Sequence, residues 1–544
     1  MGARVTNIVA ILAAVITLAA APAGRAADTF ATPAVTLHRA DWRAALEQLR
    51  AELGEAPEIA ANVALAARRH DLTADDPRRR PALVQLNGLT STIFTGIGRS
   101  PVPVLLPFDT SAYLGARARA TVDPHALSFY QSDFHTDLFD AGPSGYDAVF
   151  SLPVEVTAGL PSRIFARPIE VQITGSALTY DIADPAGGKG ESVKALRAQY
   201  PDLRRFIREG YVRYAFTRFG VPYVVSIQCL DSAPRPRRLA CREAYPVAER
   251  FLRALRVTGG QPSRRAPAIT PLAAGRPPLD DADFTYRPPG DIVARSGARG
   301  QGGRADLTAY SQILFPLDAP AFVHSQSFGR QRTSDKFDQP WSRYPWRDSF
   351  CEARDFNVGQ CASGFGHQGQ DLRPGTCPTR RDGVANCDPW QQRVLAVRDS
   401  VVIRSLKQQA VTLQVNSGTE HIRFRYMHMN PAALDKDGLL NGRSLREGEP
   451  MGVVSNYLDR PNGTTRHLHF DIQLFTRDGW IWVNPYVTLI AAYERLIGGR
   501  GREVGPQPAP SAPAIASRLA PPATTGSLPP SGPQADAAAG HNPH

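Results

Sequence analysis

The spacing of apolar residues changes along the first part of the chain. Apolar positions at helical spacing, with few helix breakers, predict helices over Asp41–Glu52 and Glu58–Arg69. From Ala82 to Val104 β-branched residues stand between Gly and Pro, and Tyr146–Val156 and Pro168–Ile182 look like strands. The pattern indicates a mixture of helices and strands.

The same mixture continues to residue 258. Val193–Glu209 and Ala244–Val257 have the spacing of helices. Tyr211–Cys229 alternates polar and apolar residues around Gly220-Val221-Pro222, which predicts a hairpin. We interpret residues 28–258 as an α+β domain of unknown type, or as two smaller ones.

The C-terminal half is predicted to be mainly antiparallel β structure, because short apolar runs are separated by Gly, Asn and Asp turns of hairpin length. The expected strands are Val394–Ile403, Val411–Val415, His421–Met429, Met451–Ser455 and Leu468–Leu474. They lie in a domain over residues 304–498. A Pro-, Gly- and Arg-rich linker at 259–303 precedes it, and a Pro/Ala-rich tail at 499–544, expected to be disordered, follows it.

Length and charge narrow the protein classes. A chain of 544 residues exceeds what one hydrophobic core usually organises, so a multidomain protein is expected. The formal charge of +11 would suit nucleic acid, since clustered cations bind phosphates. The basic residues are mostly arginines spread along the whole chain, and no recognition motif accompanies them. Nucleic acid is therefore not an expected partner.

The N-terminus has the layout of a secretory signal peptide. A basic start precedes an apolar run from Ile8 to Ala23, and the small residues Gly24 and Ala26 follow it. The run is short for a membrane span. We expect residues 1–26 to be cleaved and the protein to be periplasmic or secreted, without stable membrane insertion. An uncleaved anchor is the alternative.

Six cysteines fit an oxidising compartment, where disulfides persist. None of their spacings resembles the short knuckle of a structural zinc site. Pairing between nearest neighbours is our prediction, although six cysteines allow fifteen connectivities. The pairs would be Cys229–Cys241, Cys351–Cys361 and Cys377–Cys387.

Two short motifs in the C-terminal half hold metal-binding residue types. In the segment 366–371, His367 and Asp371 stand four residues apart, and two glycines allow a tight backbone around them. In the segment 466–470, His467 and His469 are two residues apart. In a strand both imidazoles would lie on one face, with the apolar residues next to them packed behind.

A third motif is Tyr426-Met427-His428, at the end of a strand whose Phe424 and Tyr426 are expected to share the face of His428. Catalytic zinc usually takes about three protein ligands and leaves one position to water. The motifs hold more imidazoles than such a site uses, so others are available for proton transfer, as hydrolysis of an unactivated amide requires. Four of the twelve histidines fall in these motifs, which argues against ordinary strand and turn residues.

The three motifs, taken in order, resemble the signature of the lysostaphin/LytM-type zinc metallopeptidases. That signature is His-x-x-x-Asp, then Tyr-x-His near a strand end, then His-x-His followed by Phe and an acidic residue. The resemblance covers roughly Leu307 to Ile497. Further similar segments are Phe315-Pro316-Leu317, Val394–Val402, Gly448–Val453 and Val483-Asn484-Pro485-Tyr486.

The resemblance implies a LytM-like domain, with a Duplicated-hybrid-motif-like fold, that hydrolyses peptide cross-links of bacterial peptidoglycan. Carried over residue by residue, it implies that His367, Asp371 and His469 bind Zn²⁺. It also implies that His428 and His467 form the catalytic pair. One of the two would take the proton of the attacking water, and both would hydrogen-bond the oxyanion.

The sequence departs from the family pattern in two places. An insertion between Asp371 and Val394 carries one cysteine pair, and another pair precedes the first motif, so disulfides would stiffen loops on both sides of the metal. Asp471 stands where the family more often has Glu, and it is expected to keep a carboxylate hydrogen bond to a ligand imidazole.

Two other functions stay open. Some LytM-type domains have lost their metal ligands and act as regulators or activators of other cell-wall hydrolases, although all five motif residues are present here. The main activity could instead lie in the N-terminal part, where Asp133-Phe134-His135-Thr136-Asp137 imitates a metal cluster. Such residues in a Gly/Pro-flanked loop are usually solvated turn residues.

Overall fold

The structure, a computed structural model, describes the chain in segments. They are residues 32–53, 80–118, 127–153, 168–182, 190–208, 210–229, 239–263, 308–318, 321–323, 350, 367–374, 392–455 and 467–497. The expected signal peptide, the helix over Glu58–Arg69, residues 264–303 of the expected linker, the tail and the four cysteines from Cys351 to Cys387 lie outside the described residues. Gly259, the first residue of the expected linker, instead ends a strand. The described residues before the linker and after it belong to one compact unit.

The N-terminal part is built on a seven-stranded antiparallel sheet in the order β3-β4-β5-β10-β9-β8-β7. Its strands are β3 His135–Gly142, β4 Gly145–Leu152, β5 Ile169–Ser176, β7 Glu191–Ser192, β8 Arg204–Arg208, β9 Tyr211–Arg218 and β10 Val221–Gln228. The smaller pairs β1 Val35–Leu37 with β6 Leu178–Tyr180, and β2 Val104–Leu106 with β11 Arg256–Gly259, flank it. Phe219 and Gly220 both have positive φ and close the tight turn of the β9–β10 hairpin, so the hairpin prediction is confirmed.

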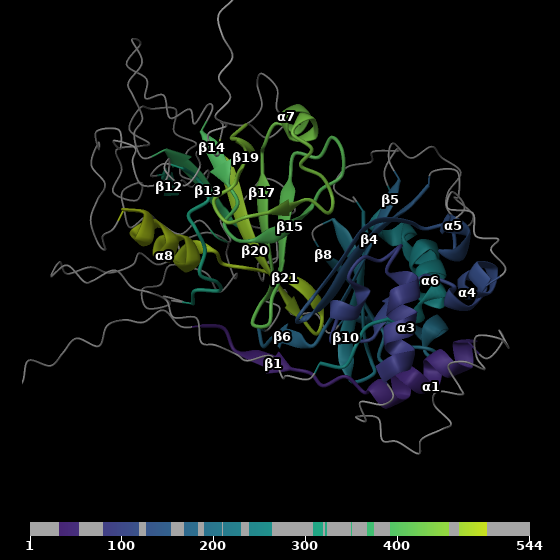
Figure 1. Cartoon of the computed structure of the whole chain (residues 1–544). Helices are drawn as coiled ribbons and strands as arrows, with labels where there is room; N and C mark the ends of the chain where they lie inside the picture. The colour runs from purple at the N-terminus through teal and green to yellow at the C-terminus, as the bar shows by residue number, and fades with distance from the viewer. Residues whose placement is uncertain are drawn as a thin grey trace, which may run out of the picture. The chain divides into compact units, whose positions relative to one another are not determined.

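Helices lie together on one side of this sheet (Figure 1). They are α1 Trp42–Leu53, α3 Arg80–Thr90, α4 Thr110–Ala118, α5 Leu127–Tyr130 and α6 Tyr245–Ala254, with short 3₁₀ turns at Ile97–Arg99, Lys194–Leu196 and Cys241–Glu243. Their apolar faces form one core with alternate residues of the strands, such as Phe150 of β4 and Tyr223 of β10. The predicted helices at Asp41–Glu52 and Ala244–Val257 correspond to α1 and α6.

Two segments differ from their sequence patterns. α3 is a helix where β-branched residues and glycines had indicated strands, because Leu83, Leu86 and Thr90 fall on one buried helical face. The predicted helix over Val193–Glu209 is wrong. Pro201 interrupts a helix interior, and β8 pairs with β9 beyond it.

The C-terminal part is mainly antiparallel β structure, as predicted, in the order β12-β13-β20-β17-β16-β15-β18, with β21 beside β20. Its elements are β12 Ala321–Val323, β13 Gln370–Pro374, β14 Arg393–Leu395, β15 Ser400–Ile403, β16 Val411–Asn416, β17 His421–Met427, α7 Pro431–Lys436, β18 Ser444–Leu445, β19 Pro450–Val453, β20 Leu468–Thr476, β21 Gly479–Val483 and α8 Tyr486–Ile497. The expected strand Val394–Ile403 is two strands, since β14 pairs with β19 and β15 with β16. The elements that were not expected are α7, α8, β12, β13, β18 and β21.

The two large sheets pack on each other through the face of the N-terminal sheet that the helices leave free. Val224 of β10 and Phe206 of β8 join Phe475 and Trp480 in one apolar cluster. Leu138 and Val149, from β3 and β4, join Ile403 of β15 in another. Between these clusters the contact is polar.

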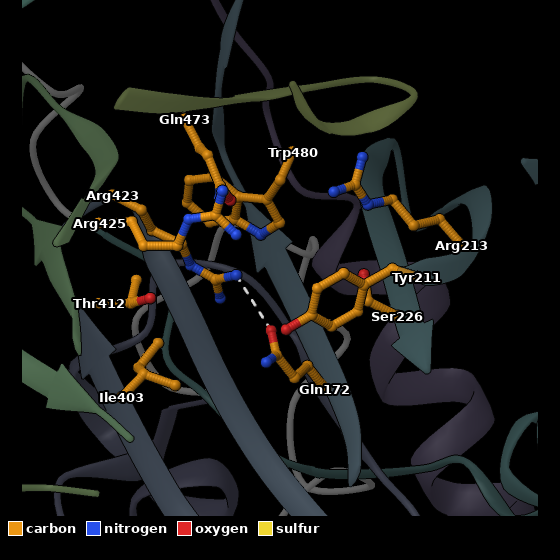
Figure 2. Close-up of a pocket in the computed structure, with 10 residues that line it drawn as sticks. All are labelled: Gln172, Tyr211, Arg213, Ser226, Ile403, Thr412, Arg423, Arg425, Gln473 and Trp480. Atoms are coloured by element: carbon orange, nitrogen blue, oxygen red, sulfur yellow. Dashed lines mark hydrogen bonds between the residues drawn. The ribbon is translucent and has the colours of Figure 1, made fainter. Parts of the chain in front are cut away.

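Asp147 of β4 is the centre of that polar contact. It is 1% exposed, and its carboxylate lies 2.7 Å from His421 Nε2 and 3.0 Å from an Arg423 Nη atom, both on β17. Arg423 also donates to Gln172 of β5 at 3.0 Å (Figure 2), and Thr174 donates to Asp147 at 2.6 Å. Burial raises the pKa of Asp147, but the charges and hydrogen bonds of His421 and Arg423 lower it by more. The net pKa is therefore below the ordinary value.

Two further observations bear on the compartment. Cys229 and Cys241 form a disulfide, so this predicted pair is confirmed. Among the described residues, no helix combines the length and apolar character that a membrane crossing needs.

Replacing Asp147 by Asn should lower the free energy of unfolding by about 3 kcal/mol at pH 7, because it leaves a buried guanidinium without its carboxylate. The folded-state pKa of Asp147 lies below 3.8, so this stabilisation is present above that pH and is lost as pH falls through the folded-state pKa. Urea denaturation from pH 7 to pH 3 should show wild type and D147N converging in acid.

Asp140→Asn is the matched control. Asp140 stands opposite Asp147 on β3, and burial and the Asp147 charge raise its pKa, so a neutral side chain there should cost little. Equal unfolding midpoints of D147N and D140N at pH 7 would contradict the role given to Asp147.

Candidate metal centre

Strand β20 places the His-x-His motif of segment 466–470 by simple alternation. His469 points to one face of the sheet, while Leu468 and Phe470 are fully buried on the other. Phe470 packs there against Phe424 and Tyr426 of β17, at ring-centroid distances of 6.1 and 5.3 Å. The sequence prediction that apolar residues pack behind the histidines is confirmed.

Strand β13 brings the first motif beside β20. Asp371 pairs with His469 across the antiparallel ladder. Gly369 makes this close approach possible, since a Cβ there would lie 2.3 Å from the Phe470 carbonyl oxygen and 2.8 Å from His469 Nε2. This glycine of the first motif is therefore required by packing.

Three donor atoms from the two motifs converge. His367 Nε2 lies 3.0 Å from Asp371 Oδ1 and 2.8 Å from His469 Nδ1, and His469 Nδ1 lies 3.2 Å from Asp371 Oδ1. All three residues are buried. Within the part of the chain that the structure describes, these three side chains form the group of potential metal ligands whose atoms lie close enough together to share an ion.

This donor set fits zinc. Zinc is bound by imidazole nitrogen and carboxylate oxygen at roughly 2.0–2.2 Å, which puts tetrahedral ligand atoms a little more than 3 Å apart. The observed separations of 2.8 to 3.2 Å match that spacing closely. Three protein ligands are the number found in catalytic sites, where the fourth position is open.

The electrostatics of the cluster favour a cation. Burial raises the pKa of Asp371, but His367 and His467 bring it well below the ordinary value, so the carboxylate is ionised. Burial lowers the pKa of His469, yet hydrogen bonds to Asp371 and Asp471 raise it overall. The surroundings of His469 thus stabilise a positive charge.

His428 reaches the cluster by an unexpected backbone conformation. Phe424 and Tyr426 pair with Ile472 and Phe470, so they face away from the histidines, and a regular strand would carry His428 with them. Its φ of 66° reverses the direction of the side chain. The prediction that His428 shares the face of Phe424 and Tyr426 is therefore wrong.

His428 and His467 lie side by side next to the three donor atoms. Their ring centroids are 4.7 Å apart, and the His428 ring is 5.9 Å from that of His469. His467 Nε2 lies 3.4 Å from Asp371 Oδ1. Burial and the neighbouring imidazoles hold the pKa of His428 well below its ordinary value, so this ring is neutral at pH 7.

A further layer of residues surrounds His469. Its Nε2 lies 3.3 Å from Asp471 Oδ2. Asp471 also accepts hydrogen bonds from Arg425 Nε at 2.7 Å and from Trp482 Nε1 at 3.1 Å. The sequence predicted the Asp471 contact but missed Arg425 and Trp482. Only the strand register, which sets Arg425 opposite Asp471, could have indicated the arginine.

The alternative cluster in the N-terminal part does not assemble in the same way. His135 Nδ1 lies 3.0 Å from Asp137, but its side chain is 67% exposed. Asp133 instead pairs with Arg250 of α6. These contacts are those of surface residues at the start of β3.

Comparison with known proteins adds structural likenesses. No protein-family model matches the chain, and no curated protein matches it. A structure from Ruminococcus gnavus, proposed to be a glycyl-glycine endopeptidase LytM, shares 19% identity over 34% of this chain and 60% of its own, with a TM-score of 0.19. This chain thus spans less than two thirds of that protein.

Two more solved structures are similar. One belongs to the SpoIIQ–SpoIIIAH pore-forming complex, with 10% identity over 31% of this chain and 87% of its own and a TM-score of 0.18. The other is from Pseudomonas aeruginosa and is proposed to be an M23 peptidase. It shares 10% identity over 62% of this chain and 98% of its own, with a TM-score of 0.17.

Proposed function

We propose that this chain is a zinc-dependent endopeptidase that hydrolyses peptide cross-links of bacterial peptidoglycan. The observation that carries the proposal is the convergence of His367 Nε2, Asp371 Oδ1 and His469 Nδ1, with two more imidazoles beside them. A site that served structure alone would use a closed set of four ligands and would have no need of the extra pair.

His367, Asp371 and His469 would hold the metal. When bound, zinc would supply a Lewis acid for the scissile carbonyl and would acidify the attacking water. His428 and His467 lie next to these ligands, where one ring would take the water's proton and the other would donate a hydrogen bond to the oxyanion. Their burial excludes bulk water, which strengthens such hydrogen bonds.

The substrate class comes from the motif resemblance to the lysostaphin/LytM type. We further infer that the protein acts in the periplasm or outside the cell. The signal-peptide layout of residues 1–26 supports this, and so does the Cys229–Cys241 disulfide, because disulfides persist in oxidising compartments.

His469→Ala should abolish stoichiometric zinc binding, because it removes one of three buried ligands. Atomic absorption after dialysis against trace zinc would measure about one zinc per wild-type chain and close to none in the variant. His135→Ala is the control, since this exposed ring belongs to the alternative cluster. Loss of zinc from H135A, with zinc retained by H469A, would transfer the metal site to the N-terminal part.

His428→Ala and His467→Ala should keep their zinc but cleave at least about 100-fold more slowly, because they lose proton transfer and oxyanion contacts. The measurement is liquid chromatography and mass spectrometry of muropeptides, after incubating cross-linked sacculi with the zinc-loaded chain. Wild type alone should deplete cross-linked dimers, and the fragment masses identify the bond. Intact dimers with zinc-loaded wild type would instead indicate a non-catalytic regulator.

A further inference from the structure

Arg213 links the N-terminal sheet to the candidate metal centre. It belongs to β9, on the sheet face opposite the helices, and is 3% exposed. Its guanidinium carbon lies 5.1 Å from the centroid of the Trp482 ring in the C-terminal part. A desolvated guanidinium at this distance is attracted to the indole face. Trp482, which Arg213 contacts across the two sheets, therefore also donates a hydrogen bond to Asp471.

Trp482 is held by register as well as by stacking. It pairs with Gln473 across β20 and β21, so its side chain lies on the face that carries His469 and Asp471. Arg425 contacts the same ring at 5.0 Å and also donates to Asp471. Guanidinium groups from both parts of the chain thus fix the indole whose N–H reaches Asp471.

The space between the sheets at this point is narrow. A cavity of about 30 Å³, large enough for about two waters, separates Arg213 and Tyr211 from Arg425 and Gln473 (Figure 2). The indole of Trp480 borders the same cavity. Trp482 itself is 1% exposed, so its indole is closely packed beside Asp471.

We propose that Arg213 is a positioning residue for His469, which it orients through Trp482 and Asp471, so that the N-terminal part sets the metal affinity of the C-terminal site. This inference rests on the proposed function, because it takes His469 as a zinc ligand. Asp471 fixes the ring of His469 with Nδ1 toward Asp371 and His367. Arg213 keeps the indole donor of Asp471 in place.

The expected effect is moderate. Loss of a direct partner of a metal-binding histidine typically weakens metal affinity about 10–100-fold. Arg213 acts two contacts further away, so Arg213→Met should raise the dissociation constant for zinc about fivefold. Methionine keeps an apolar stem over the indole and removes the charge. Arg213→Lys, which restores a cation, should recover part of the affinity.

The test uses the full chain freed of zinc. Competition with a fluorescent chelator gives the zinc dissociation constant, and the visible absorption of the Co²⁺-loaded chain reports the ligand field at the site. R213M should weaken zinc binding and shift the Co²⁺ bands. Trp482→Phe keeps a ring for stacking but removes the N–H, so it should weaken zinc about tenfold. The double variant R213M/W482F should bind zinc no more weakly than W482F.

Arg204→Met is the matched control. Arg204 lies on the neighbouring strand β8 and pairs with Asp478 in the β20–β21 turn at 2.6 Å, so R204M loses a contact between the two parts and leaves Trp482 untouched. Its zinc affinity and Co²⁺ spectrum should equal those of wild type. Equal weakening in R204M and R213M would overturn the inference, because general loosening of the sheets would explain both.

Unchanged zinc affinity and Co²⁺ bands in R213M would overturn it as well. If R213M does not fold, as judged by circular dichroism, W482F decides, and wild-type behaviour of W482F overturns the proposed chain of contacts. Failure of the proposed function looks different. A wild-type chain that binds no zinc refutes the metal site itself, whereas a wild-type chain that binds zinc without cleaving sacculi leaves the R213M comparison intact.

Discussion

The two-residue period of β20 is the constraint on which the rest of the structure depends. Along β20, which begins at Leu468, His469, Asp471, Gln473 and Phe475 must all point to the same face. His469 belongs to the candidate metal centre, Asp471 contacts it, and Phe475 packs against the N-terminal sheet. The candidate metal centre and the attachment of the N-terminal part therefore share one surface. Shifting the register of β20 by one residue would send all four to the apolar face and destroy both.

A shared surface explains why the contact between the sheets is so polar. The face of the candidate metal centre continues into His421, Arg423 and Arg425 of β17, and packing a second sheet on it buries His421 and Arg423 and partly buries Arg425. Burying an unpaired charge is costly, so each needs a partner. Asp147 of the N-terminal sheet pairs with His421 and Arg423, and Asp471 of the C-terminal sheet pairs with Arg425. Such a network adds little net stability compared with an apolar contact, but it fixes which residues face each other.

The sequence predicted what depends on local pattern. The spacing of His467 and His469 placed both rings on one face, and hairpin-sized gaps predicted β15, β16, β17 and β20 of the eight-stranded C-terminal sheet. It failed where long-range contacts decide. β8 is a strand because β9 lies beside it, and β14 and β15 separate because each finds a different partner. His428 could be recognised by its motif but not by its face, since only the folded backbone reveals the positive φ that turns its ring toward His467. Arg425, Trp482 and Arg213 carry no motif at all. Their relation to His469 comes from strand register and from packing between parts of the chain that no local pattern connects.

The packing also limits how a peptide could reach the histidines. From His469 to Gln473 β20 rises about 13 Å, and by Gln473 its face is already covered by Tyr211, Arg213 and Ser226 of the N-terminal sheet. The cavity left there holds no more than about two waters. A chain bound at the histidines therefore cannot run along this face past Asp471 while the sheets stay together. Separating the sheets would break the Asp147–Arg423 pair and expose the apolar clusters beside it, so a peptide that binds at the histidines is expected to approach from the end of β20 where His367 and Asp371 lie.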